Sequence, residues 1–360
     1  MKIVDRHLSG EFGRVFAVAA ATFSGLFLLV EFFEKLRVFL KYDAGAGDAL
    51  LFLLARLPWM VSQVLPMATL LGTLLSLMLL ARHGEITALR SAGISLPRLA
   101  APYLACGLAV AAFNALVQEV AAPRGFAFAR EVQEVRIKKR PPSSLLKTED
   151  LWLRSEERIL HVNLVTPEDG RLVGVSVAEL EGNRVRRRID AAEAHWADGG
   201  WVLHRAVVRE FSADGAMARE ERETLSYPLR ERLEDFLLAE ASPDEATWAE
   251  LRRRIARYRA QGIETRSLEV ALWSRTSLPL VNVIMPLLGF PFAVRAGRRG
   301  GTALALVASI FLGFAYWLSL AVGMGLGNAG VLPPALAAWA GNLLGAAAGA
   351  VLLVRAERAG

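Results

Sequence analysis

The side chains that most often perform catalysis or bind metals are few in this sequence and far apart. The histidines are His7, His83, His161, His195 and His204, and Cys106 is the only cysteine. No two histidines have the His-x-x-x-His spacing, and no cysteine and histidine are spaced for zinc. A Gly-x-x-x-x-Gly-Lys-Ser/Thr loop and a Gly-x-Ser-x-Gly turn are also missing. We therefore predict a chain that is not an enzyme and binds no metal or cofactor itself.

Charged side chains offer a different chemistry. A cation cluster follows the first apolar block and consists of Lys35, Arg37 and Lys41. Such a cluster can bind an anion, and phosphate-bearing lipid is an anion that a membrane offers. The alternative is local pairing with Glu31, Glu34 and Asp43, with the long stems reaching to the headgroups. Both interpretations stay open.

A second candidate site lies in the short segment at about 83–92. The residues expected to carry it are Gly84, Glu85, Ile86, Leu89 and Arg90. The last three share one face of a helix, and Gly93 follows as a stop. Such a helix could dock into the groove of a partner protein, or it could be a simple amphipathic loop at the membrane interface. The spacing favours neither.

Long apolar blocks must position these residues. A bilayer core about 30 Å thick takes roughly 20 helical residues to cross. The blocks that pass are approximately Phe12–Phe33, Leu57–Leu80, Pro97–Val120, Leu268–Val294, Ala303–Gly325 and Pro333–Val354. Charges cluster at their ends, because an ionised side chain at mid-membrane costs at least ~2.5–3.5 kcal/mol. We predict a membrane α-helical protein, with transmembrane helices 1–3 in residues 1–122 and helices 4–6 in residues 267–360.

Basic residues near the short loops predict the orientation. With six spans, they fall on one side, as four sets: Lys2, Arg6 and Arg14; Arg82, Arg90 and Arg98; Arg295, Arg298 and Arg299; Arg355 and Arg358. That side is then cytoplasmic and holds both termini. Residues 123–266 would lie outside, as in a bacterial periplasm. The net charge of +6 follows from the cytoplasmic loops and the basic outer domain, so no nucleic-acid partner is needed.

The apolar period changes to two inside segment 123–266. Short β-prone runs are Leu151–Leu153, Ile159–Val162, Leu172–Val177, Trp201–Leu203 and Val207–Phe211. Turn signals separate them: 168–170, 181–183, 198–200 and 214–215. This spacing predicts an all-β antiparallel sandwich or jelly roll. A capped connector helix is expected at about 243–261, and a helical stalk at Gly125–Lys139.

Several pieces of the chain resemble a known family. They are Val4–Leu8, Leu65–Gly72, Gly84–Gly93, Met285–Phe292 and Gly327–Pro334. In this order around a mid-chain β domain, they resemble the lipopolysaccharide export permeases of the LptF/LptG family (YjgP/YjgQ), and LptG more than LptF.

The resemblance implies the permease subunit of an ABC transporter in the bacterial inner membrane that extracts lipopolysaccharide. It implies pairing with the paralogous permease LptF and recruitment of a dimer of the ATPase LptB, which would bind ATP and Mg²⁺. The periplasmic domain would pass the lipid to the bridge of LptC and LptA. The segment at 83–92 would be the coupling helix with Glu85 as its acidic residue, and lipid A phosphates would meet Lys35 and Arg37.

The chain departs from some relatives at Glu31, where a lysine is found in certain members. A carboxylate facing the cavity would repel phosphate unless it paired with Lys35, four residues on.

Candidate cavity-wall residues are Phe27, Phe32, Phe311, Phe314 and Trp317, although aromatic side chains in spans also simply pack or face lipid.

Two other functions fit the architecture. The chain could be a non-transporting membrane scaffold whose periplasmic β domain binds a partner protein. It could also be an ABC permease for another lipid or a lipoprotein. A scaffold does not explain a coupling loop with glycine on both sides, and the three-plus-three arrangement argues against a lipoprotein-release subunit.

Overall fold

The computed structural model describes residues 2–139, 148–155, 157–166, 170–182, 184–197, 200–211, 217–228, 243–260, 262–298 and 302–358. The chain divides into two compact units. One, here called the helical unit, comprises residues 1–129 and 269–360, and the other, called the β unit, comprises residues 130–268. The β unit is thus inserted into the sequence of the helical unit.

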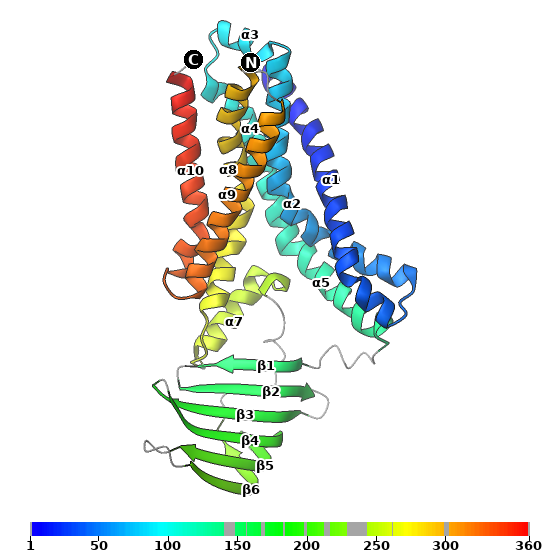
Figure 1. The fold of residues 1–360 in the computed structure, drawn as a ribbon, viewed down its shortest axis with the longest axis vertical. Helices are drawn as coiled ribbons and strands as arrows, with labels where there is room; N and C mark the ends of the chain where they lie inside the picture. The colour runs from blue at the N-terminus through cyan, green and yellow to red at the C-terminus, as the bar shows by residue number, and fades with distance from the viewer. Residues whose placement is uncertain are drawn as a thin grey trace. The chain divides into compact units, whose positions relative to one another are not determined.

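Long helices make up the helical unit (Figure 1). They are α1 (Lys2–Lys41), α2 (Ala46–Arg82), α3 (Glu85–Ser91), α4 (Leu96–Leu116), η1 (Val117–Ala121, a π-helix), α5 (Ala122–Glu131), α8 (Arg266–Arg298), α9 (Thr302–Asn328) and α10 (Pro334–Arg358). Six helices among the described residues are long and apolar enough to cross a membrane. The short α3 lies at the end of the unit where both chain termini are found.

The helices run beyond the predicted spans. α1 extends well beyond its apolar block at both ends and α2 begins well before its block, since helix propensity does not require an apolar side chain and Lys, Arg and Glu are good helix formers. Helical structure also continues past α4 through α5 to the π-helix η2 (Val132–Ile137). Hydropathy marks only the part of each helix that suits the hydrocarbon core.

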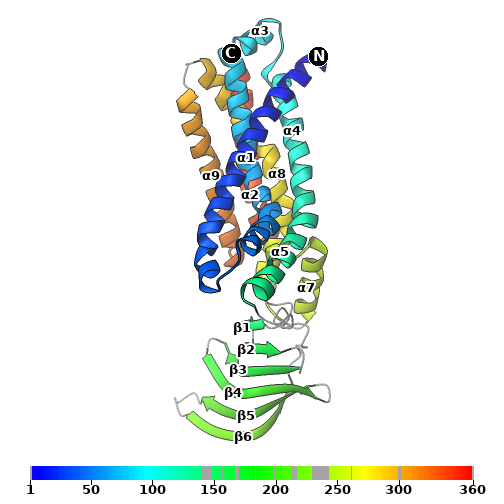
Figure 2. The ribbon, with the colours of Figure 1, turned by 90° about the vertical axis from the view of Figure 1, so that its right-hand side faces the viewer.

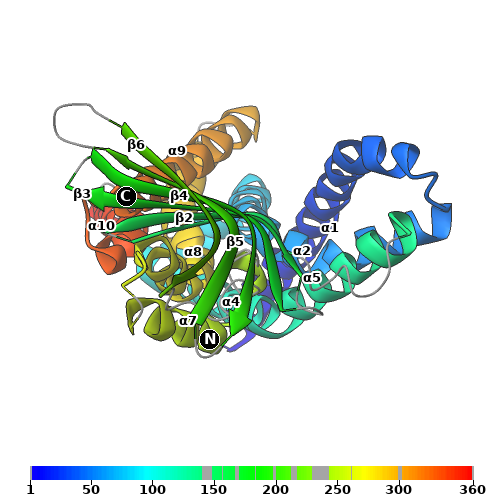
Figure 3. The ribbon, with the colours of Figure 1, turned by 90° about the horizontal axis from the view of Figure 1, so that it is seen from below.

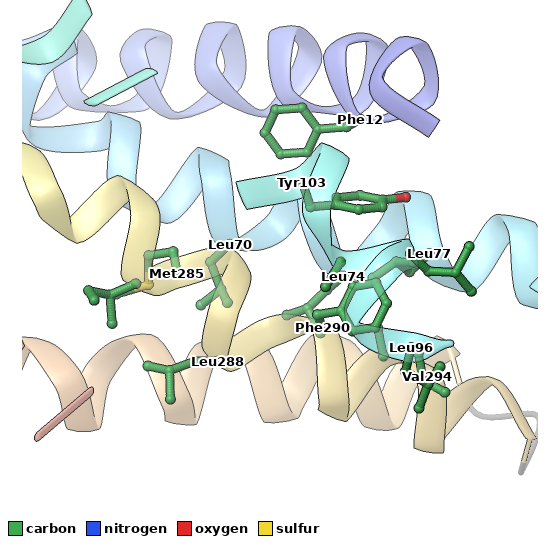
Figure 4. Packing of buried hydrophobic residues seen from close by; sticks show 14 of the residues in the cluster. Phe12, Leu70, Leu74, Leu77, Leu96, Tyr103, Met285, Leu288, Phe290 and Val294 are labelled. Atoms are coloured by element: carbon green, nitrogen blue, oxygen red, sulfur yellow. The ribbon is translucent and has the colours of Figure 1, made fainter. Parts of the chain in front are cut away.

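Residues of α1, α2, α4 and α8 make up most of the core of the helical unit, with smaller contributions from α3, α9 and α10 (Figure 4). Leu70 and Leu74 of α2 pack with Tyr103 of α4 and Phe290 of α8, and all four are almost fully buried. The rings of Phe12 and Tyr103 meet edge to face with centroids 5.9 Å apart. This packing ties helices on both sides of the inserted β unit into one body.

Close approach of α4 to α8 depends on Gly107. A Cβ atom at this position would lie 2.5 Å from the backbone oxygen of Asn282 and 3.1 Å from Cγ of Pro286. Small residues let membrane helices approach until their backbones nearly touch. Gly107 therefore sets the distance between α4 and α8.

The β unit contains one antiparallel sheet whose strands follow in sequential order (Figure 2). They are β1 (Thr148–Arg154), β2 (Arg158–Thr166), β3 (Arg171–Glu181), β4 (Arg184–Ala197), β5 (Gly200–Phe211) and β6 (Met217–Tyr227). Six candidate membrane helices with an antiparallel β region in mid-chain confirm the coarse prediction of the fold. The jelly-roll connectivity stays a prediction.

A row of skipped positions crosses this sheet. Along this row the cross-strand pairs omit one residue in each strand, namely Asp150, Asn163, Gly174, Ala192, Arg205 and Glu223. Gly174 and Arg205 have positive φ values of 65° and 53°. On either side of this row the buried side chains belong to one core, although the alternation of buried residues shifts by one. Figure 3 shows the curvature of the sheet.

The skipped row explains one error of the sequence analysis. Trp201–Leu203 and Val207–Phe211 were expected as separate runs, but they belong to the single strand β5 and are separated by Arg205 at the row. The strands β4 and β6 were missed because their sequences are rich in charged residues and, in β6, nearly every side chain is exposed. No period-two pattern of burial marks such a strand.

The connector helix α7 (Trp248–Ala260) begins later than expected. Its first turn is closed by a capping box, in which the Glu250 amide donates to Thr247 Oγ1 (3.3 Å) and the Thr247 amide donates to Glu250 Oε2 (2.7 Å). Pro243–Glu245 form a separate 3₁₀ turn. After α7, Ile263 bridges to Ser155 beside β1, which joins this helix to the sheet.

Candidate functional site

Two glycines delimit α3, the helix of the predicted coupling segment. Gly84 stands at its N-cap with φ 74°, and Gly93 follows its C-terminal end with φ 85°. Both angles lie in the left-handed region that glycine adopts without strain. The Ile94 amide donates to the Leu89 carbonyl (3.2 Å), which completes the C-terminal cap.

The inner face of α3 is fixed to the rest of the helical unit. Ile86 is 5% exposed and belongs to the main core, against which Leu89 is partly buried. Arg90 pairs with Glu357 of α10, with 2.7 Å between Nη1 and Oε2. These three predicted residues are therefore engaged within the chain.

The outer face of α3 is exposed and carries only small side chains. It consists of small exposed residues: Thr87, Ala88 and Ser91. Glu85 lies at the edge of this face with 38% of its side chain exposed, and one carboxylate oxygen is 2.8 Å from Nε2 of His7 on α1. A carboxylate beside a face of small side chains can receive a cationic group while a partner backbone approaches closely.

Sequence reasoning missed His7 and Glu357, which hold α3 in place. They lie 78 and 267 positions along the chain from Glu85 and Arg90, respectively. A further ion pair at this end joins Asp5 of α1 to Arg98 of α4 (2.7 Å), and both residues line a small pocket with Leu8 and Leu99. No spacing rule connects residues so far apart, although charges near both termini were a signal.

The cation cluster lies on the last turns of α1. Lys35 Nζ is 3.9 Å from Glu34, Arg37 is exposed, and Lys41 Nζ lies 5.4 Å from the centroid of the Tyr42 ring. Such a weak carboxylate contact leaves Lys35 with charge available to an anion. All three cations therefore remain near one helix end.

Glu31 does not pair with Lys35, as the sequence had suggested. It is 5% exposed and its carboxylate lies 3.2 Å from Arg56 of α2. The Arg56 guanidinium is also surrounded by the rings of Phe52, Trp59 and Phe126, at 5.3–5.8 Å from their centroids. Glu31 faces α2 because this cation and its aromatic neighbours stabilise the buried carboxylate.

The predicted cavity-wall residues fall into two groups. On α1, Phe27 contacts Trp59 edge to face (5.8 Å), and Phe32 lies among Phe33 and Phe39. On α9, Phe311, Phe314 and Trp317 are 70%, 56% and 59% exposed. The second group thus forms an apolar surface on this chain, which suits lipid or another membrane protein.

Metal ligands do not gather in the part of the chain that the structure describes. No group of three or more His, Cys, Asp and Glu side chains there is arranged to hold a metal ion. Cys106 lies in α4 as a free, partly buried thiol. The candidate sites described above consist of a carboxylate on α3, a cation cluster on α1 and an apolar surface on α9.

Comparison with known proteins accounts for this arrangement. A family model described as "Lipopolysaccharide export system permease LptF/LptG" matches residues 6–355. The chain is 22% identical over 323 residues to the lipopolysaccharide export system permease protein LptG of Escherichia coli K12, covering 88% of both chains. It is also 22% identical over 324 residues to the LptG protein of Haemophilus influenzae Rd, again covering 88% of both. The chain therefore belongs to the LptF/LptG family of lipopolysaccharide export permeases.

Proposed function

We propose that this protein is the permease subunit of an ABC transporter that extracts lipopolysaccharide from the bacterial inner membrane. Its β unit would pass the lipid to a bridge that crosses the envelope. The observation that carries the proposal is α3: a short helix with an open face of small side chains, a partly exposed carboxylate at Glu85, and an inner face fixed to α1 and α10.

This geometry suits a helix that receives force from a partner. Movement of α3 would reach α1 through Glu85 and His7, and the main core through Ile86. The end of the unit that carries α3 also holds both termini, so we assign this end to the cytoplasm and the β unit to the periplasm. The basic residues near the short loops support the same assignment.

An external source of work is needed for lipid extraction. Each methylene group of an acyl chain contributes ~0.8 kcal/mol to membrane anchoring, so a lipid with several chains does not leave spontaneously. We expect the work to come from an ATPase of the LptB kind, a dimer that binds ATP and Mg²⁺ itself. This chain would have no catalytic site and no cofactor of its own.

A paralogous permease of the LptF kind is the expected neighbour within the membrane. The most apolar stretch of α1 is only 11% buried and that of α9 only 28%, whereas that of α8 is 72% buried. Phe311, Phe314 and Trp317 enlarge this apolar surface on α9. Its extent supports a partner with similar spans and a lipid-binding cavity bounded by α1 and α9.

The outer end of α1 would receive the phosphates of the lipid. Lys35, Arg37 and Lys41 carry positive charge there, while the carboxylate of Glu31 is turned to Arg56 and so does not oppose a phosphate. The β unit, with a jelly-roll fold, would accept the acyl chains and hand the lipid to LptC and LptA. The three spans before the β unit and the three after it would form the membrane part of the transporter subunit.

Substitution of Glu85 tests the role of α3. We expect Glu85→Lys to abolish co-purification of the ATPase from native membranes and to stop lipopolysaccharide delivery, because the open face then presents a cation. Glu264→Lys is a matched control, since that carboxylate is exposed just before α8 and has no part in either proposed site. His7→Ala removes the internal contact but leaves Glu85, so it should retain the ATPase. Normal delivery and normal ATPase association in Glu85→Lys would contradict the docking role.

Photocrosslinking tests the lipid site. We expect the double change of Lys35 and Arg37 to Glu to weaken crosslinking of lipopolysaccharide to the outer end of α1. Arg186→Glu, an exposed charge reversal on β4, should leave it unchanged. Unchanged crosslinking in the double variant would remove the phosphate site. Reporter fusions at Gly200 and Arg298 would check the predicted topology, and co-purification without any ATPase would favour the scaffold function.

A further inference from the structure

Glu357 joins the end of α10 to both elements that follow α2. Its Oε2 atom accepts a hydrogen bond from Nη1 of Arg90 on α3 (2.7 Å) and another from the backbone amide of Leu96, the first residue of α4 (2.9 Å). One carboxylate oxygen therefore connects α3, α4 and α10. These contacts span 267 and 261 positions of sequence.

The contact with Leu96 acts as an N-cap supplied by another helix. The first amides of an α-helix lack acceptors within the helix, and a negative charge at that end is favourable. Ser95 occupies the N-cap position, yet its side chain makes no capping hydrogen bond. Glu357 takes over this role, so the start of α4 depends on the last turn of α10.

Apolar packing supports the same junction from below. Ile86 of α3, Leu96 of α4 and Ala356 of α10 are all buried in the main core of the helical unit. Leu353, one turn before Glu357, is partly buried against that core. The carboxylate of Glu357 is thus held in a fixed position by the packed apolar residues next to it.

The covalent connections of α3 are pliable by comparison. Gly84 and Gly93 flank the helix, and a Cβ atom at either position would meet nothing within 4 Å. Glycine has the widest conformational freedom of any residue, so α3 can tilt about these two points. A tilt transmits force only where side chains tie the helix to its neighbours.

We propose that Glu357 is a positioning residue that transmits movement of α3 into α4 and α10. This inference rests on the proposed function, in which an ATPase moves α3. When α3 is displaced, Arg90 draws Glu357 with it, and Glu357 in turn carries the start of α4 and the end of α10. Without this carboxylate, movement of α3 still reaches α1 through Glu85 and His7, but α4 and α10 lose their side-chain link to α3.

The test uses the complete transporter in proteoliposomes, loaded with purified lipopolysaccharide and supplied with the bridge protein as acceptor. Three quantities are measured: the ATPase bound per permease, the rate of ATP hydrolysis, and the lipid transferred. Glu357→Ala removes both hydrogen bonds, and Arg90→Met removes only the hydrogen bond between α10 and α3. Glu11→Ala, which removes an ion pair with Arg14 within α1 alone, is the matched control.

We expect Glu357→Ala and Arg90→Met to retain the bound ATPase and its hydrolysis, but to raise the ATP used per lipid by about tenfold or more, as the loss of a charge-assisted hydrogen bond implies. The exchanged pair Arg90→Glu with Glu357→Arg should recover most of the coupling. Amide hydrogen exchange at the start of α4 should rise in Glu357→Ala and not in Arg90→Met. This difference separates the contact of Glu357 with Leu96 from its contact with Arg90.

An unchanged ratio of ATP to lipid in Glu357→Ala would overturn the inference. So would a loss of bound ATPase in proportion to the loss of transfer, because Glu357 would then only shape the docking face. If Glu357→Ala does not reach the membrane, Arg90→Met and the exchanged pair carry the test. A native transporter that binds no ATPase or transfers no lipid would instead refute the proposed function.

Discussion

The carboxylate of Glu31 on α1 lies 3.2 Å from the guanidinium of Arg56 on α2, and the carboxylate is almost fully buried. The rings of Phe52, Trp59 and Phe126 surround the arginine, and its side chain is only 20% exposed. In such surroundings each charge depends on the other. The pair therefore joins the C-terminal half of α1 to the N-terminal half of α2, next to the cation cluster.

Removal of the arginine should be costly. We expect Arg56→Ala to lower the free energy of unfolding by about 3–5 kcal/mol, because it leaves a buried carboxylate without its cation. Denaturant unfolding of the full chain in detergent micelles measures the change. The double variant with Glu31→Leu and Arg56→Leu should recover much of the loss, since no charge is then left behind. Arg37→Ala, on an exposed site, should change stability by less than about 0.5 kcal/mol; equal effects of Arg56→Ala and Arg37→Ala would contradict the account.

Gly107→Ala tests the approach of α4 to α8. The added methyl group would lie 2.5 Å from the Asn282 backbone oxygen, so the helices must separate, and overpacking of this kind costs about 1–3 kcal/mol. Gly25→Ala on α1 is the matched control, because its Cβ would meet nothing within 4 Å. That substitution should be neutral or stabilise by up to about 1 kcal/mol. Thermal unfolding of both variants would settle the comparison, and equal midpoints would show that the two helices have room to spare.

Asp190 of the β unit should make stability depend on pH. Partial burial raises the pKa of its carboxyl, but hydrogen bonds from Ser176 (2.7 Å), Arg188 (3.1 Å) and Arg209 outweigh this and leave the pKa below its usual value. A pKa lowered by folding stabilises the native state above the unfolded value of about 4, and this contribution disappears as the pH falls through the folded value.

We therefore expect Asp190→Asn to weaken the sheet at neutral pH and to flatten the loss of stability in acid. Amide exchange of β4 and β5 in the full chain, corrected for its intrinsic pH dependence, measures this. Glu223→Gln on β6 is an exposed control and should leave the profile of β4 and β5 as in the unaltered chain. A steeper acid loss in Asp190→Asn than in the unaltered chain would reverse the assigned sign.

The spans were predictable because a bilayer selects for composition alone. Roughly 20 apolar residues identify a crossing whatever it packs against. The lengths of α1 and α2 were not predictable in this way: the polar start of α1, Lys2–Gly10, is helical without an apolar pattern, and α2 begins before the block that was recognised. The sheet was recognised where buried and exposed side chains alternate, and missed in β6, where hardly any residue is buried.

The candidate site was predictable only where its parts are close in sequence. Glycines on both sides of a short apolar pattern pointed to α3, because turn chemistry is local. Its anchors His7 and Glu357 are brought to it by the folding of whole helices, and no local rule names them. The same limit explains the wrong partner predicted for Glu31. Helical spacing pointed to Lys35, four residues on, but Glu31 is buried against α2 and pairs with Arg56 there.

The row of skipped positions from Asp150 to Glu223 divides the sheet of the β unit into two parts. Each of the six strands has its omitted residue at this row, and the register resumes on both sides of it. Because no strand is paired with its neighbour at this level, the two parts of the sheet are joined there by the six strand backbones alone.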